Sequence, residues 1–79
     1  MFDHFLDNSA QAQRNRLLDA LRVAPLTTIE ARRNLDILMP GARIEELRDA
    51  GCRIDTVFVW RPTECGKEHR VALYVLQHG

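Results

Sequence analysis

Hydrophobic residues in the first part of the chain recur with the period of an amphipathic helix. Asn8 or Ser9 offers an N-terminal cap, and Asn8 with a glutamine three residues later resembles a capping box. The apolar stripe that follows consists of Leu17, Leu18 and Leu21. Because a proline disfavours helical geometry in the residue before it, Pro25 is expected to end this first helix near Val23.

A second helix signal begins at Thr27, because a threonine followed three residues later by a glutamate is typical of a capping box. In that motif the Glu30 amide donates to the Thr27 hydroxyl, and the Thr27 amide donates to the Glu30 carboxylate. We expect the helix to run to about Leu35, with Ala31 among its buried contacts. The pair Asp36-Ile37 is expected to end it.

Pro40 and Gly51 bound a third predicted helix. Proline suits the first helical turn, where its missing amide has no partner to lose. Glycine suits the position just after the last turn, where a left-handed residue closes the helix. The spacing of apolar and small residues predicts an inward face made of Pro40, Ile44, Leu47 and Gly51.

After Gly51 the hydrophobic period changes to two, which is the period of a β-strand. The pattern predicts one strand over residues 54–60, a loop over residues 61–68 and a second strand over about residues 69–76. These strands form a hairpin, which must pack one face on the helices because a lone hairpin is marginally stable in water. The pattern leaves open which face is buried. Trp60, at the end of the first strand, is interpreted as a core or hairpin-shoulder residue rather than a ligand platform, and the sequence leaves both alternatives open.

The chain has 79 residues and a formal net charge of zero, which favours one domain and argues against a strongly basic nucleic-acid binder. We expect residues 1–8 to be an N-terminal extension and residues 9–79 to be the domain. Phe2, Phe5 and Leu6 either fold back on the first helix or mediate a homodimer. No apolar run approaches membrane-spanning length, and the N-terminus does not read as a signal peptide, so the expected compartment is the cytoplasm.

Three helices followed by a two-stranded hairpin are the α+β layout of a winged helix-turn-helix domain. The agreement is specific at PLTTIEARR (residues 25–33), at ARIEELRDAGCRI (residues 42–54) and at YVL (residues 74–76). In these segments the chain resembles a small winged-helix family common in bacterial prophages and phages. The resemblance covers roughly residues 14–76. It implies a regulator that binds double-stranded DNA, with the third helix in the major groove and the hairpin, or wing, along the backbone or a minor groove.

Arg43 is the leading candidate for a DNA contact, because one guanidinium can donate to both O6 and N7 of guanine. Basic residues on the second helix and around the hairpin loop are expected to contact phosphates. The full set of expected DNA contacts is Arg32, Arg33, Ala42, Arg43, Glu45, Arg61, Lys67 and Arg70.

The solvent side of the third helix is acidic, which opposes this simple interpretation because phosphates repel carboxylates. A protein-interaction module on the same scaffold, such as a phage-encoded inhibitor of a host complex, is the alternative. In that case a basic protein surface would meet Glu45, Glu46 and Asp49.

The sequence offers no motif for catalysis or for a cofactor: it has no glycine-rich phosphate loop and no nucleophile with a nearby base. Cys65 and His69 have a spacing seen in zinc sites, but two ligands do not make a structural site. A strand separates Cys52 from Cys65, so both are expected to be free thiols. We therefore expect neither an enzyme nor a metal site.

Overall fold

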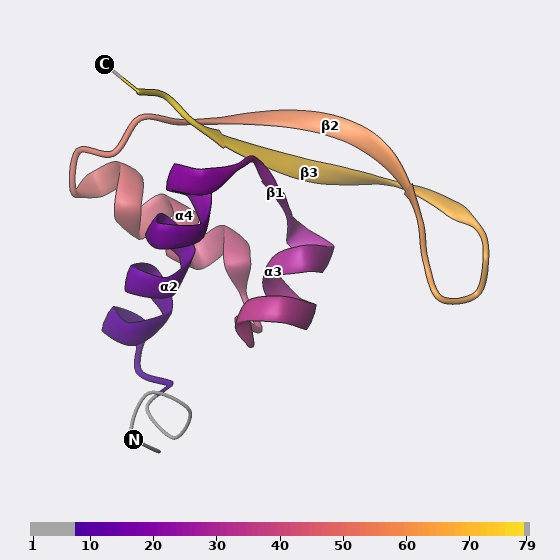
Figure 1. Ribbon diagram of the computed structural model, residues 1–79, viewed down its shortest axis with the longest axis horizontal. Coiled ribbons are helices and arrows are strands. Elements are labelled where there is room, and N and C mark those ends of the chain that lie inside the picture. Colours follow the sequence, from indigo (N-terminus) through magenta and orange to yellow (C-terminus); the bar gives the residue numbers. More distant parts are fainter. Residues whose placement is uncertain (1–7, 79) are drawn as a thin grey trace.

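The computed structural model describes residues 8–78, so Phe2, Phe5 and Leu6 lie outside the described residues. Within that part of the chain, three helices and a three-stranded sheet follow one another (Figure 1). The elements are α2 (Ala10–Val23), β1 (Leu26–Thr27), α3 (Thr28–Leu35), α4 (Pro40–Asp49), β2 (Ile54–Pro62) and β3 (Glu68–Leu76). No helix in residues 8–78 is long and apolar enough to cross a membrane.

The N-terminal cap of α2 is Ser9, whose hydroxyl accepts from the Ala12 amide at 3.2 Å. The predicted capping box between Asn8 and Gln11 is therefore wrong, because Ser9 occupies the cap position. The helix ends at Val23 as predicted, and the amide of Ala24 still donates to the carbonyl of Ala20.

Both hydrogen bonds of the predicted capping box form at the start of α3. The Glu30 amide donates to Thr27 Oγ1 at 3.1 Å, and the Thr27 amide donates to Glu30 Oε1 at 2.8 Å. The helix ends at Leu35, and Asp36 caps it in the left-handed conformation with φ of 54°. This turn directs Ile37 into the core, where it is fully buried.

Helix α4 begins at Pro40 and ends at Asp49, close to the predicted boundaries. Pro40, Ile44 and Leu47 are buried, as the spacing predicted. Gly51 is exposed and was wrongly assigned to the inward face. Its φ of +104° shows that it closes the helix through its backbone conformation.

The sheet has three strands in the order β1-β3-β2, which corrects the predicted two-stranded hairpin. The extra strand, β1, is formed by the last two residues of the link between α2 and α3. It pairs antiparallel with β3 through Leu26 opposite Tyr74 and Thr27 opposite Leu73. The strands of the hairpin also extend further than predicted, so that only residues 63–67 form the loop. That loop is closed by the Thr63 amide, which donates to the Lys67 carbonyl at 2.9 Å.

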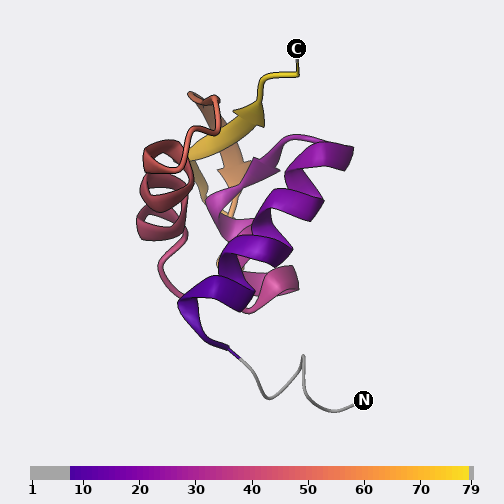
Figure 2. The same cartoon turned by 90° about the vertical axis from the view of Figure 1, so that its left-hand side faces the viewer.

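All three described helices lie on one face of the sheet (Figures 1 and 2). From β2 and β3, respectively, Ile54 and Tyr74 reach into the core and are 4% and 7% exposed. The other buried hydrophobic residues of the core are Leu17, Leu21, Ala31, Ile37, Ile44 and Leu47. The inner face of the hairpin, which the sequence left open, is therefore the face of Ile54 and Tyr74.

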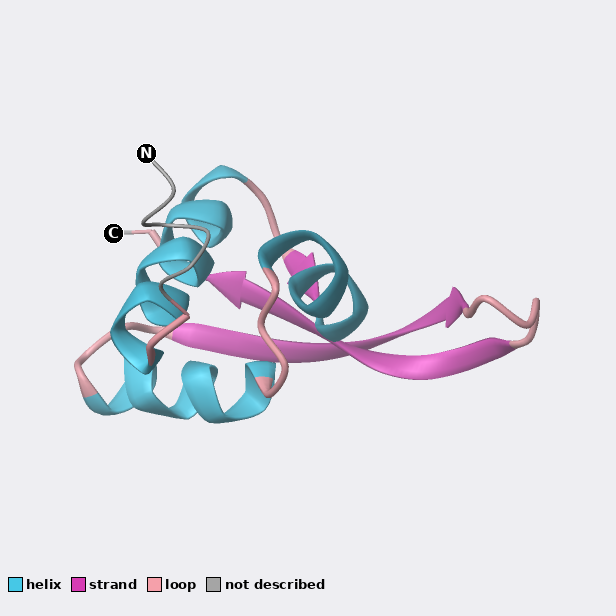
Figure 3. Ribbon diagram, turned by 90° about the horizontal axis from the view of Figure 1, so that it is seen from below, coloured by secondary structure: helices cyan, strands magenta, loops and turns pink. Residues whose placement is uncertain are grey.

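Past the helices, the hairpin continues as a projecting wing (Figure 3). Because side chains alternate between the faces of a strand, Phe58 and Trp60 lie on the same face as Ile54. No helix covers them, and they are 55% and 63% exposed. The interpretation of Trp60 as a core residue is therefore wrong.

Candidate nucleic-acid interface

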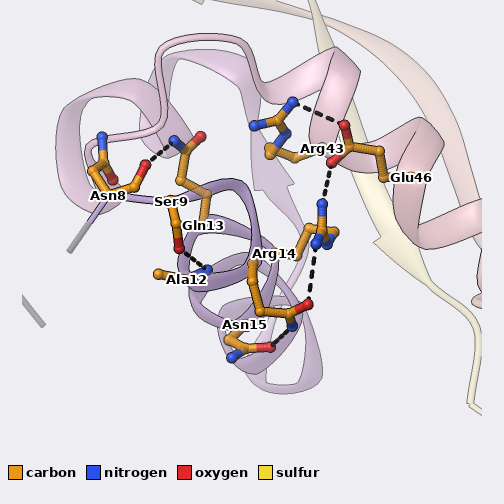
Figure 4. A network of polar contacts seen from close by, with 9 residues as sticks. Asn8, Ser9, Ala12, Gln13, Arg14, Asn15, Arg43 and Glu46 are labelled. Atoms are coloured by element: carbon orange, nitrogen blue, oxygen red, sulfur yellow. Dashed lines mark hydrogen bonds and ion pairs between the residues drawn. The ribbon is translucent and has the colours of Figure 1, made fainter.

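Helix α4 is joined to α2 by Arg14, which shares the carboxylate of Glu46 with Arg43 of α4 (Figure 4). Arg14 Nη1 donates to Glu46 Oε1 at 2.7 Å, and Arg43 Nη2 donates to Glu46 Oε2 at 2.9 Å. The side chains of Arg14 and Arg43 are only 26% and 18% exposed. Arg43, the leading candidate for a DNA contact, is thus half-buried and engaged within the molecule.

These contacts change the chemistry of both partners. The hydrogen bond from Arg14, together with the positive charge of Arg43, lowers the pKa of the Glu46 carboxyl from its ordinary value. Nε of Arg43 is buried and has no hydrogen-bond partner among residues 8–78. The Nε–H of Arg43 is therefore a donor that the fold does not use.

The second arginine of α4 is also engaged, at the junction with the sheet. Arg48 donates to the Ile54 carbonyl from Nε at 2.9 Å and from Nη2 at 2.7 Å, and to Thr56 Oγ1 at 2.8 Å. Its Nη1 pairs with Glu45 Oε2 at 2.6 Å. Arg48 therefore holds the C-terminal part of α4 against the free edge of β2.

What remains on the solvent side of α4 is a surface without an unpaired cation. Ala42, Glu45 and Asp49 are exposed. At the entry to the helix, Leu38 is 78% exposed and Met39 is 63% exposed. The predicted acidic face is present for Glu45 and Asp49, whereas Glu46 turns toward Arg14 and Arg43.

On α3, the two candidate phosphate contacts are exposed but differ in their partners. Arg32 Nε donates to the Leu38 carbonyl at 3.2 Å, across the turn between α3 and α4. Arg33 Nη2 pairs with Glu64 Oε1 at 3.0 Å and so links α3 to the tip of the wing. Both side chains of this second contact are well exposed, so water screens the pair and it adds little to stability.

The three basic candidates on the wing form no ion pair with residues 8–78. Arg61 Nη1 donates to the Trp60 carbonyl at 3.0 Å, and the guanidinium of Arg70 lies over the Phe58 ring, 4.2 Å from its centroid. The side chain of Lys67 is exposed at the base of the loop. The free positive charge of the candidate interface therefore lies on the wing and at Arg32 of α3, and not on α4.

Both cysteines are free thiols, in agreement with the sequence analysis. A hydrogen bond with the Thr63 hydroxyl and one with the Lys67 backbone lower the pKa of the exposed Cys65 thiol. No group of three or more potential metal ligands occurs within residues 8–78.

Sequence reasoning did not identify Arg14 and Arg48 as residues that hold α4 in place. Arg14 lies 32 residues from its partner Glu46. The periodicity of a helix or a strand does not predict a contact between residues so far apart in the sequence. The exposed aromatic residues Phe58 and Trp60 were missed for a different reason. The alternating pattern of the strand places both side chains on one face. That pattern does not show how far the hairpin extends beyond the helices.

Comparison with known proteins identifies the family. No curated protein and no solved structure is significantly similar to this chain. A family model described as a winged helix-turn-helix domain matches residues 12–79, which include nearly all of α2 and every later element. The α+β fold described above, with three helices beside an antiparallel sheet, agrees with that match. The chain belongs to the winged helix-turn-helix domain family.

Proposed function

We propose that this protein binds double-stranded DNA and acts in the cytoplasm as a transcriptional regulator of the phage or prophage type. The observation that carries the proposal is the family match over residues 12–79, because winged helix-turn-helix domains are typically DNA-binding modules without enzymatic activity. The geometry supports it, since α4 exposes one side to solvent and the wing projects beyond the helices (Figure 3).

The entry of α4 is the part best suited to the major groove. Met39 and Ala42 are exposed there and carry no charge, so they can contact thymine methyl groups without repelling phosphates. Arg43 joins the contact by exchanging Glu46 for a base or a phosphate. The carboxylate of Glu45 accepts from a cytosine amino group.

Phosphate contacts come from α3 and the wing, where the exposed basic residues are Arg32, Arg33, Arg61, Lys67 and Arg70. Because the whole chain has a formal net charge of zero, few phosphates are neutralised. We therefore expect the binding constant to fall with salt, but less steeply than for a strongly basic protein. A homodimer that reads two half-sites is part of the proposal.

Fluorescence polarisation with a labelled mixed-sequence duplex, at two salt concentrations, tests the proposal. Arg33→Ala is expected to weaken duplex binding several-fold and to reduce the salt dependence. Arg22→Ala on α2 is the matched control, because its ion pair with Asp19 has the same 3.0 Å distance and Arg22 is as exposed as Arg33, at 59%. Equal binding by both variants, or no duplex binding at low salt, would contradict the proposal.

A second candidate function is the recognition of a basic protein surface by α4. The observation that favours it is that Arg43 and Arg48 are paired with Glu46 and Glu45 of α4 itself, while Asp49 is exposed and has no ion pair with residues 8–78. Asp49→Lys separates the two functions by the sign of its effect. It raises affinity for duplex DNA if α4 faces phosphates, and it disrupts the complex if α4 faces a basic protein.

A further inference from the structure

The wing carries two large aromatic side chains that the fold itself does not use. Phe58 and Trp60 alternate along β2 on the face that packs on the helices further back, but they are 55% and 63% exposed. They lie outside the core, which ends on this face at Ile54 and Tyr74. Large exposed aromatic residues grouped on one surface are typical of a binding site.

The register of the hairpin places a cation and a small residue beside the two rings. Trp60 lies opposite Arg70, and Phe58 lies opposite Ala72. The Arg70 guanidinium stacks on the Phe58 ring at 4.2 Å from the centroid. Because Ala72 is small, this face of the wing presents flat groups, namely an indole and a guanidinium-covered phenyl ring, with little crowding from the opposite strand.

The charge around the aromatic pair selects the ligand. Arg70 lies on the same face as the two rings, and Lys67 lies in the adjoining loop. Neither forms an ion pair with residues 8–78, so their charge is available to an anion. One carboxylate, Glu68, lies on the same face as Arg70, two residues before it, and opposes an anion there. A ligand that combines flat π-faces with negative charge suits this surface, and nucleic acid with accessible bases has both properties.

We propose that Phe58, Trp60 and Arg70 form a stacking site for unpaired nucleobases, as presented by single-stranded or locally opened DNA. Bases in an intact duplex are stacked on one another and offer no free face. This site therefore distinguishes unpaired from paired bases, and does not distinguish one base sequence from another. The inference goes beyond the proposed duplex binding by α4. It requires only the wing, which projects past α3 (Figure 1).

Trp60 reports on its own site, because it is the single tryptophan of the chain. Its fluorescence is followed while three DNAs of one mixed sequence are added, namely a single strand, a full duplex and a duplex with a central run of mismatches. Quenching is expected with the single strand and the mismatched duplex at lower concentrations than with the full duplex. Unchanged Trp60 emission at concentrations where polarisation shows the single strand fully bound would overturn the proposal.

Substitutions then test the residues, with binding of a labelled single strand followed by polarisation. Trp60→Ala is expected to weaken this binding about tenfold, the scale of one lost base stack, and Trp60→Phe to restore most of it. Glu68→Gln is expected to strengthen it. Val57→Ala is the matched control, since Val57 lies on the opposite face of the same strand and is 47% exposed.

Equal single-strand binding by Trp60→Ala and Val57→Ala would overturn the stacking site. Circular dichroism verifies that both variants are folded, which is expected because neither residue belongs to the core. The stacking site and the proposed function fail separately. Loss of single-strand binding alone in Trp60→Ala supports the stacking site and leaves duplex binding intact, whereas a protein that binds the single strand through Trp60 but not the duplex contradicts the proposed function only.

Discussion

At the scale of single residues, Glu46 links two helices through its carboxylate. It accepts from Arg14 of α2 and from Arg43 of its own helix, and neither arginine is well exposed (Figure 4). The placement of α4 against α2 therefore rests on an ion network as well as on the apolar core. The same network restrains Arg43, which must leave Glu46 before it can reach a base.

Glu46 also makes stability depend on pH. Because the native structure lowers the pKa of its carboxyl, the ionised form stabilises the fold above the ordinary value of 4.5, and this contribution is lost as the pH falls toward the lower pKa. Glu46→Gln is therefore expected to give a lower Tm at neutral pH and a shallower decline of Tm with acid. Thermal unfolding between acidic and neutral pH measures both effects.

Asp49→Asn is the control for that experiment, because Asp49 lies on the same helix, is exposed and has no ion pair with residues 8–78. The Tm of this variant should decline with acid as the Tm of the natural protein does. An unchanged pH profile for Glu46→Gln would show that the network adds nothing to stability.

At the scale of elements, the residues that determine where a helix begins or ends lie within a few positions of that boundary. The capping box at Thr27 and Glu30 spans four residues, and the Pro40 start and Gly51 closure of α4 are equally local. Such signals are readable from the sequence because they do not depend on the rest of the fold. β1 was missed because it has only two residues, and its partner Tyr74 lies at the other end of the chain.

Thr27→Ala is expected to lower the free energy of unfolding by about 1–2 kcal/mol, because it removes the hydroxyl that accepts from the Glu30 amide. Chemical denaturation followed by circular dichroism measures the change. Thr27→Ser retains the hydroxyl and should keep most of the stability. If the alanine and serine variants unfold at the same denaturant concentration, the cap is not a source of stability for α3.

The candidate site was less predictable than the fold, for a physical reason. The sequence identified the basic and acidic residues that might contact a partner, but their engagement depends on contacts between distant elements. Arg43 was expected to be available and is half-buried on Glu46, whereas Arg70 is available but lies on the Phe58 ring. Whether a charged side chain is free to bind a partner depends on its neighbours in the folded protein, and the spacing of hydrophobic residues does not predict those neighbours.

At the scale of the whole molecule, the fold divides into a packed part and a projecting part. The helices, the link between α3 and α4, and the adjoining ends of β2 and β3 hold every buried hydrophobic residue described, and the far part of the hairpin holds none. Within residues 8–78, the only ion pair between the wing tip and the helices is the exposed contact of Arg33 with Glu64. Folding and the proposed binding by the wing are therefore separable.

Replacement of residues 62–68 by Asn-Gly joins Arg61 to His69, which are register partners, through a tight turn. The shortened protein is expected to unfold cooperatively with a free energy within about 1 kcal/mol of the full chain, because it loses one surface ion pair and no core contact. Thermal denaturation measures stability, and polarisation measures DNA binding. A loss of cooperative unfolding would show that the tip supports the fold.

Arg48 has a consequence for any duplex that meets both α4 and the wing. By donating to the Ile54 carbonyl and to Thr56, it braces the last turn of the helix against the first residues of β2, so the two cannot swivel independently. A rigid pair of contacts imposes its own spacing on the DNA. Under the proposed function, a duplex whose own geometry differs from that spacing must deform to meet both contacts, and steps that deform easily, such as pyrimidine–purine steps, would then be favoured at positions the protein never touches.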